Sequence, residues 1–367
     1  MFTATQRLST TGRYDLLVSD MQQNQANFNR LTAQLASGHK VQSITDDPIA
    51  AVNIINTNRQ LGQIDTFSTN VNMAMEELDT LDDLLSLATG YLSNAWDKAT
   101  QANNQTYGEN SLKALKVEID EITKTMVDLA NTEYNDNYIF GGANTKLQPY
   151  EINAETGEII YNGTPYENKD YIRQTEIADG VFEVINTTGD RVFGYYRQAE
   201  TADGDKIFLD KDGKEVIQKF DAAAQTYSYE YEDGTAFDAA KVDELKMKED
   251  YAGVFGALKN LSNSIQEVLD GQTEDGYKKM NATLDQFKNS LTQMTNEQTK
   301  FGGVYNRLEM TESTLETNNT NLTSYLSEIQ DVDLTTAVTE WYQAQYAYQA
   351  SLQITSASMG MSLLNYL

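Results

Sequence analysis

The sequence predicts an α+β protein: both chain ends build a rod of long antiparallel helices, a coiled coil or helical bundle, with a small β-rich domain inserted between them. Three observations lead to this fold class. Apolar residues recur in alternating steps of three and four through the first and last thirds of the chain, which is typical of a coiled-coil seam. Asn-Gly and Asp-Gly dipeptides crowd the middle third, where they predict hairpins. Of the three prolines, only Pro48 lies in the helical parts.

The two helical thirds must pack on each other, and this requirement divides the chain into three parts. The length of 367 residues suits such a division, since domains usually have roughly 100–200 residues. We expect a terminal coiled-coil assembly domain, a bundle of long helices and an inserted β-rich domain, formed by residues 1–45 with 330–367, 46–136 with 250–329, and 137–249 respectively.

The first predicted helix carries a narrow apolar seam that ends at a glycine. Its next seam position after Leu35 is Gly38, which can adopt the positive φ of a residue that follows a helix end. A polar residue, Asn24, interrupts the stripe and is a candidate for fixing its register. The seam comprises Tyr14, Leu17, Met21, Asn24, Phe28, Leu31 and Leu35.

The second helix is predicted to begin at Pro48. The proline ring suits the first helical position and favours an extended Asp47, whose carboxylate can accept from a free N–H of the first turn. The apolar pattern is loose as far as Gly62 and regular afterwards. The regular seam comprises Ile64, Phe67, Val71, Ala74, Leu78, Leu81, Leu85, Ala88, Leu92, Ala95, Ala99 and Ala102.

Four further seams predict the remaining helices. They run over residues 112–129, 254–268 and 280–329, and over a last segment that comprises Leu334, Val338, Trp341, Gln345, Tyr348, Leu352, Thr355 and Met359. Gly302 and Gly303 lie inside the longest seam and cost about 1 kcal/mol each relative to alanine. We therefore expect a kink or a close packing contact there.

The middle of the chain has the pattern of short strands joined by tight turns. The clearest strands are residues 159–161, 181–185 and 227–231, and the tyrosines of the last are expected to share one face. We expect a small β sandwich or barrel. The turn signals are Thr156-Gly157, Asn162-Gly163, Asp179-Gly180, Thr188-Gly189-Asp190, Asp203-Gly204, Asp212-Gly213 and Asp233-Gly234.

Composition excludes several classes of function. The chain has 27 Lys+Arg against 55 Asp+Glu, a net charge of −28, which argues against nucleic acid and anionic lipid as partners. No cysteine and one histidine exclude disulfides, Cys-ligated zinc and the usual nucleophile–histidine pairs. No stretch has the roughly 18 apolar residues of a membrane span, so no membrane insertion is expected. The first residues lack the apolar core of a cleaved signal peptide.

No motif predicts a catalytic, cofactor or metal site. Residues 210–215 begin like a calcium loop, but Lys214 stands where that loop needs Asp or Asn, so we expect a hairpin turn. His39 follows the helix-ending glycine and is expected to be a loop or interface histidine. The carboxylate pairs Glu76-Glu77 and Asp82-Asp83 fall between seam positions and are expected on a solvated helix face.

Three segments resemble the bacterial flagellin and hook-associated protein family. Residues 35–41, followed by Thr45 to Ala51, resemble the turn near the N-terminus of that family, with Ser37-Gly38, a basic pair and Val41 before Asp46-Asp47-Pro48. Residues 137–142, Asn-Tyr-Ile-Phe-Gly-Gly, resemble the segment that leads from the third helix into the variable domain. Residues 348–353 and 360–367 are similar to the C-terminus. The resemblance covers about residues 1–148 and 250–367.

The resemblance implies a structural adaptor of the bacterial flagellum that joins the hook, through hook-associated protein 1, to the flagellin filament. It further implies type III export to the flagellum without a cleaved signal peptide, chain ends that order on assembly, and an export chaperone bound to the C-terminal part. The implied partners are copies of the chain itself, hook-associated protein 1, flagellin and that chaperone. The implied assembly interface comprises Leu17, Met21, Phe28, Leu31, Leu35, Leu334, Val338, Trp341, Tyr348, Leu352, Met359, Leu363, Leu364 and Leu367.

Other functions stay open on the sequence alone. The chain could be flagellin, the filament subunit itself, which follows the same fold logic. From other classes, the acidic insert could carry a carbohydrate-processing or calcium-binding enzyme, and the heptads alone would suit a cytosolic coiled-coil scaffold. The scaffold leaves the terminal motifs unexplained, and calorimetric titration with calcium or sugars would test the enzyme.

Overall fold

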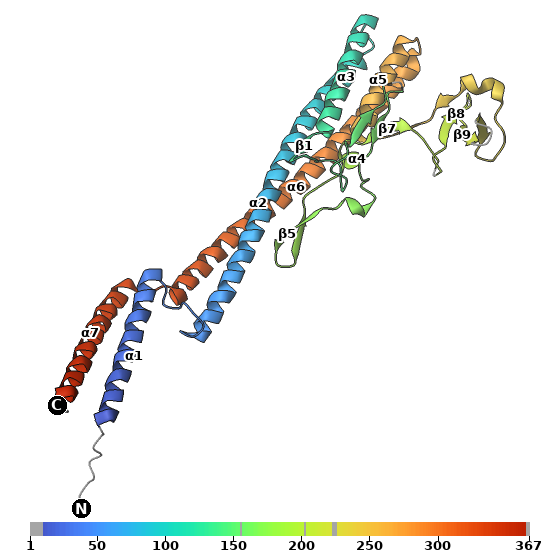
Figure 1. The fold of residues 1–367 in the computed structure, drawn as a ribbon. Helices are drawn as coiled ribbons and strands as arrows, with labels where there is room; N and C mark the ends of the chain where they lie inside the picture. The colour runs from blue at the N-terminus through green and yellow to red at the C-terminus, as the bar shows by residue number, and fades with distance from the viewer. Residues whose placement is uncertain (1–9, 155, 202, 222–225, 365–367) are drawn as a thin grey trace, which may run out of the picture. The chain divides into compact units, whose positions relative to one another are not determined.

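The computed structural model describes residues 10–154, 156–201, 203–221 and 226–364. The chain divides into two compact units (Figure 1). The first is formed by Met1–Phe67 with Ser313–Leu367, and the second by Ser68–Glu312. The first unit is therefore built from both chain ends, and the second from one continuous segment.

The first unit is built mainly from one pair of helices, and it includes the loop that leads from the first of them into α2. Helix α1 (Thr10–Ser37) packs along α7 (Leu334–Leu364), and Figure 1 shows the two side by side. The unit also holds the first turns of α2 (Pro48–Ala102) and the last turns of α6 (Thr273–Gln330). Helix α1 ends where the sequence predicts, because Gly38 has φ +78° and its N–H donates to Gln34 O at 2.9 Å.

The second unit contains the predicted bundle of long helices. Besides the rest of α2 and α6, it has α3 (Glu109–Ala130), which packs on α5 (Gly253–Leu269). The regular seam of α2 is its buried stripe from Val71 to Ala102, and α3 and α5 bury most of the seams predicted for them. Helix α6 buries every second position of its predicted seam from Met280 to Leu308. Between these positions it buries Thr283, Ser290 and Glu297, each one residue before the predicted one. The largest buried side chains of the predicted seams are Leu78, Leu81, Leu85, Leu92, Ile119, Met126, Phe287 and Phe301.

The glycine pair in α6 does not make the close packing contact that the sequence suggests. Helix α6 runs unbroken from Thr273 to Gln330. A Cβ built at Gly302 or Gly303 meets nothing within 4 Å. The seam at Phe301 and Leu308 stays buried, and the glycines lie on the exposed side of the helix.

The described strands of the insert form small antiparallel sheets rather than one sandwich or barrel. Two sheets have four strands, in the orders β10-β9-β8-β11 and β12-β7-β4-β3, and two have two strands, β1-β2 and β5-β6. Each four-stranded sheet has two open edges, so neither closes into a barrel. The strands are β1 (Glu133–Tyr134), β2 (Asn137–Tyr138), β3 (Tyr150–Ile152), β4 (Ile159–Tyr161), β5 (Gln174–Ala178), β6 (Val181–Val184), β7 (Tyr195–Gln198), β8 (Lys206–Leu209), β9 (Glu215–Asp221), β10 (Thr226–Tyr231), β11 (Lys246–Met247) and β12 (Glu249–Ala252).

Most of the predicted turns connect these strands. The glycines at 157, 180, 204, 213 and 234 all have positive φ, as the tight turns require. Two of the turn signals differ from this pattern. Gly163 does not have a positive φ, and Gly189 is the first residue of the short helix α4 (Gly189–Val192). Two 3₁₀ helices, Lys169–Tyr171 and Ala239–Glu244, complete the insert.

An aromatic cluster joins the insert to α5. Tyr150, Phe193 and Phe255 are fully buried and their ring centroids lie 5.0–6.2 Å apart. Tyr150 donates its hydroxyl to Gly194 O at 2.9 Å, and burial raises the pKa of Tyr150, so it remains a donor. A Cβ at Gly194 would lie 1.9 Å from Ala252 O, so this close approach of two backbones requires glycine.

Candidate assembly surface at the chain ends

The α1–α7 seam uses the predicted residues of α1. Leu31 is 2% exposed, and Leu17, Met21, Phe28 and Leu35 are half-buried. The ring of Phe28 lies 5.6 Å from that of Trp341 and 6.0 Å from that of Tyr348, between centroids. These aromatic contacts hold the two helices in one register.

The seam of α7 differs from the predicted one by one position at alternate turns. Trp341, Tyr348 and Thr355 face α1 as expected, but the residues between them are small: Ala337, Ala344 and Ser351. The indole N–H of Trp341 donates to Thr32 Oγ1 at 2.9 Å. The sequence pattern instead selected the next residue at each of these turns: Val338, Gln345 and Leu352. Small residues at these seam positions let the two helices approach closely.

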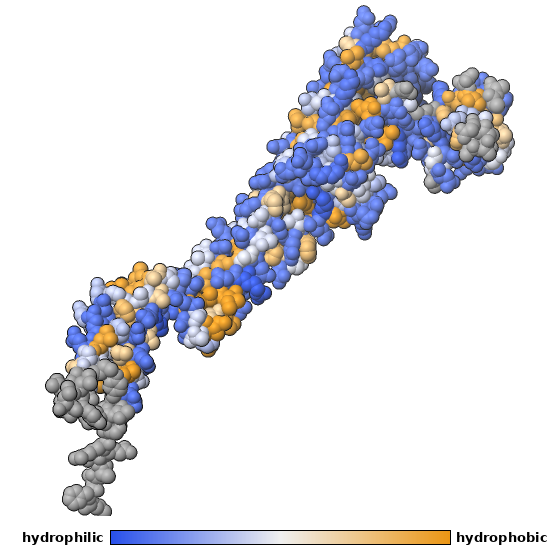
Figure 2. All heavy atoms as spheres, in the orientation of Figure 1, coloured by the Kyte–Doolittle hydropathy of each residue, from blue (hydrophilic) through white to orange (hydrophobic). Residues whose placement is uncertain are grey.

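The larger residues consequently form an exposed stripe on α7. We call Leu334, Val338 and Leu352 the outer stripe; they are 60%, 40% and 41% exposed. Hydrophobic residues are visible among those at the surface of this unit in Figure 2. Met359, Leu363 and Leu364 continue the backbone of α7, but their side chains, like that of Tyr14 and all of Leu367, lie outside the described residues.

A second group of exposed aliphatic residues begins α2. Ile49, Val52 and Ile55 are 76%, 53% and 58% exposed, and Ile44 in the preceding loop is also exposed. This outward aliphatic face explains why the apolar pattern before Gly62 is loose. The sequence reasoning missed it, although the looseness itself was the signal.

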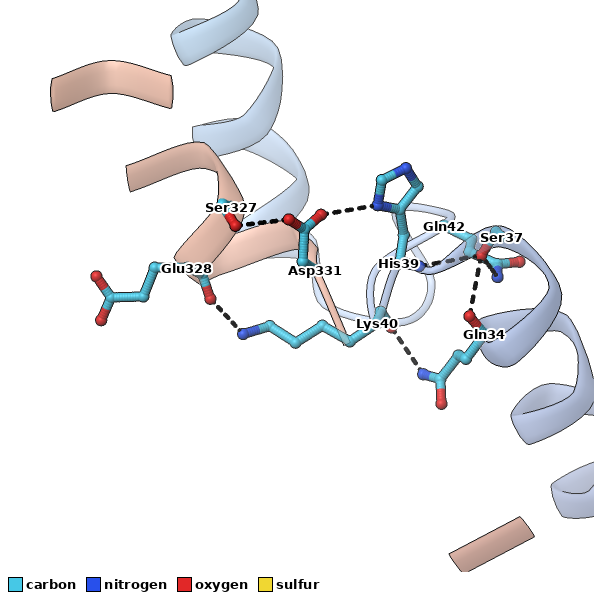
Figure 3. Close-up of polar contacts among 8 residues, drawn as sticks. All are labelled: Gln34, Ser37, His39, Lys40, Gln42, Ser327, Glu328 and Asp331. Atoms are coloured by element: carbon cyan, nitrogen blue, oxygen red, sulfur yellow. Dashed lines mark hydrogen bonds and ion pairs between the residues drawn. The ribbon is translucent and has the colours of Figure 1, made fainter. Parts of the chain in front are cut away.

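The loop after α1 is tied to the end of α6 (Figure 3). Lys40 N donates to Gln330 O at 2.7 Å, and Val332 N donates to Gly38 O at 2.9 Å, which makes a short antiparallel bridge. His39 Nδ1 lies 3.1 Å from Asp331 Oδ1, and Lys40 Nζ donates to Glu328 O at 2.6 Å. We call these contacts between residues 38–40 and 327–332 the loop clamp.

Asp331 is the charged centre of the loop clamp. Ser327 Oγ donates to its Oδ2 at 2.6 Å. This hydrogen bond and the neighbouring His39 lower the pKa of Asp331. His39 is thus the loop histidine that the sequence predicts, with a partner that no local pattern indicates.

Aspartates begin both helices that leave the loop clamp. Asp47 Oδ1 accepts from Ile49 N and Ala50 N, both at 3.0 Å, and α2 begins at Pro48. Asp333 Oδ1 accepts from Thr335 N at 2.9 Å and caps α7. Hydrogen bonds from the Thr336 hydroxyl and backbone lower the pKa of Asp333. The starting direction of α2 and of α7 is therefore fixed by a carboxylate.

The described residues hold no group of three or more His, Cys, Asp or Glu that could bind a metal ion. Asp210 Oδ1 accepts from Asp212 N and Lys214 N, so the calcium-like segment is the β8–β9 hairpin turn. Within the described part, no helix is long and apolar enough to span a membrane. The carboxylates Glu76 and Glu77 are not simply solvated, because Glu76 accepts from the Tyr134 hydroxyl of β1 and Glu77 pairs with Arg173 of the insert.

Residues 8–145 match the bacterial flagellin N-terminal helical region, and residues 284–367 match the bacterial flagellin C-terminal helical region. Flagellar hook-associated protein 3 of Escherichia coli is 23% identical over 358 residues, 97% of this chain and 98% of that protein. Flagellin of Clostridium tyrobutyricum is 21% identical over 350 residues, 88% of this chain and 90% of that protein. Flagellar hook-associated protein 3 from Legionella pneumophila shares the fold, with a TM-score of 0.55 and 18% identity over 75% of this chain and 98% of that one.

Proposed function

Since this chain belongs to the bacterial flagellin family, we propose that it is a structural adaptor at the junction between the flagellar hook and the filament. One observation carries the proposal: similarity to a hook-associated protein 3 extends over 97% of the chain, the insert included. Flagellin is the second candidate, because a flagellin is similar over 88% of the chain. In either position the chain is a structural protein and not an enzyme.

We propose that the outer stripe of α7 and the aliphatic face of α2 contact neighbouring subunits. Exposed apolar residues grouped on one face mark protein–protein contacts. Leu334, Val338 and Leu352 would then bind between subunits, while Leu31, Phe28, Trp341 and Tyr348 hold α1 and α7 together within one subunit. Head-to-tail contacts of this kind build helical assemblies.

The partners follow from the position at the junction. They are other copies of the chain, hook-associated protein 1 on the hook side and flagellin on the filament side. An export chaperone would cover the C-terminal region before assembly, since its apolar residues need a partner in the free chain. The chain would reach the flagellum by type III export, without loss of a signal peptide.

Seeded polymerisation of the purified chain, followed by negative-stain electron microscopy, tests the assignment. A junction adaptor should stay monomeric or form short stubs on hook fragments that carry hook-associated protein 1. These stubs should extend only after flagellin is added. Long filaments grown from this chain alone would make it flagellin.

Two paired variants test the surface in the same assay. Val338→Asp with Leu352→Asp should abolish stub formation, because each places a charge on the apolar stripe. Thr339→Asp with Gln353→Asp changes adjacent exposed positions of the same helix and should leave stubs intact. The two double variants should have equal helix content by far-ultraviolet circular dichroism, which controls for unfolding. Equal loss of assembly in the two pairs would contradict the outer stripe as the contact.

A further inference from the structure

The β5–β6 hairpin and its flanking residues touch two long helices of the second unit. We call residues 173–191 the bridging segment. It contains Arg173, the hairpin, and the residues that lead to α4. All its partners named below lie between Ser68 and Glu312, within that one unit.

One side of the bridging segment contacts α2. Arg173 pairs with Glu77, whose side chain is only 15% exposed. Seven residues earlier on the same helix, Asn70 Nδ2 donates to Glu176 O at 2.9 Å. The segment therefore binds α2 at two points about two turns apart.

The other side contacts α6. Glu183 Oε2 lies 2.9 Å from Arg307 Nη1. Arg191 Nε donates to Glu297 Oε1 at 3.0 Å, and Glu297 is 4% exposed. Here too the two contacts on the helix are separated, by ten residues.

The same stretch of α2 and α6 is a place where the two helices approach each other. The negative charge of Asp79 of α2 is the largest cause that raises the pKa of Tyr305 of α6, so the two residues lie close enough to interact electrostatically. Glu77 and Glu297 are carboxylates with little exposed surface, and each is paired with an arginine. The bridging segment supplies those arginines, Arg173 and Arg191.

We infer that the insert has a mechanical function: residues 173–191 brace α2 against α6. Each helix is held by an arginine–carboxylate pair and a second contact. The pairs are partly desolvated, so breaking one leaves a poorly solvated charge without its arginine partner. The brace accounts for why Glu77 and Glu297 carry charges at half-buried and buried positions of α2 and α6.

Hydrogen–deuterium exchange of the full chain tests the brace, because contacts to one helix can be removed while exchange is measured in the other. Glu183→Gln with Arg307→Gln removes only contacts to α6. If the segment braces the helices, exchange should rise about tenfold in residues 68–80 of α2 as well as in residues 297–312 of α6. Conversely, Arg173→Gln removes only a contact to α2 and should raise exchange in α6.

Two controls complete the test. Glu121→Gln removes an exposed ion pair with Lys124 within α3 and should leave exchange in both segments unchanged. The charge-swapped double variant, Glu183→Arg with Arg307→Glu, should restore slow hydrogen–deuterium exchange in both helices. The proposal would be overturned if the exchange rate increased only in the hairpin and in the helix that carries the substitution. It would also be overturned if the charge-swapped variant failed to restore protection.

Discussion

Gly38, Asp47 and Asp331 show how single residues fix the turn between α1 and α2. The roles of Gly38 and Asp47 follow from local rules for helix ends, and both can be predicted within a few residues of sequence. The role of Asp331 cannot, because its partner His39 is 292 positions away. Local patterns identify caps, but they carry no information about which distant loop a carboxylate meets.

The loop clamp should weaken in acid. The pKa of Asp331 is lowered in the folded chain from its ordinary value of 3.8. A lowered carboxyl pKa contributes stability above the unfolded pKa, and this contribution is lost as pH falls through the folded pKa. Amide protection of Lys40 and Val332, measured by hydrogen exchange and corrected for intrinsic rates, should therefore stay constant above about pH 5 and fall as pH decreases through the lowered pKa, below 3.8.

Asp331→Asn should lower that protection at pH 6 and abolish its pH dependence. Glu328→Gln is the matched control, because Lys40 binds the carbonyl of Glu328 and not its carboxylate (Figure 3). The clamp would not depend on the Asp331 charge if both variants kept the wild-type profile.

Among the helices, the sequence pattern is fully accurate in one and only partly accurate in another. The seam of α2 in the second unit combines leucines with alanines, and every position from Val71 to Leu92 in the predicted series is buried. Helix α7 places alanine and serine at alternate seam positions, and the pattern selected their larger neighbours. Periodicity alone did not decide between Ala337 and Val338, or between Ser351 and Leu352, because both members of each pair suit the spacing of the seam.

Two nearby leucines of α2, one buried and one exposed, test whether the α2 seam carries the stability of the second unit. Leu85→Ala should cost about 3 kcal/mol of unfolding free energy, since it leaves a cavity at a fully buried position. Leu87→Ala, at a position 50% exposed, should change it by no more than about 0.5 kcal/mol. Urea unfolding followed by circular dichroism provides the comparison. Similar costs for the two would mean that the α2 seam does not carry the stability of the second unit.

For the whole molecule, the sequence predicts an insert between two helical regions but not what the insert does. Hairpins and their turns are local, so β4, β6 and β10 fall where the pattern expects them. The division into separate sheets depends on which strands meet, as does the bridging segment. Glu77 in particular reads as a solvated residue until Arg173, 96 positions away, is brought beside it.

The net charge of −28 predicts how assembly responds to salt. Copies of an acidic chain repel one another, and salt screens that repulsion over about 10 Å at 0.1 M. Stub formation, followed by light scattering on hook fragments, should therefore be faster at 300 mM than at about 30 mM NaCl. A slower rate at high salt would instead indicate that complementary charges drive the contact.

The loop clamp also sets an order of events in folding. It joins residues 292 positions apart, and the entropic cost of closing a loop increases with its length. The second unit folds from one continuous segment and, once folded, brings the two ends of that segment into a fixed relation. The contacts of α1 with α7 then become local in effect, so the first unit should form last. The chain can thus complete most of its core while its two terminal helices are still unpaired.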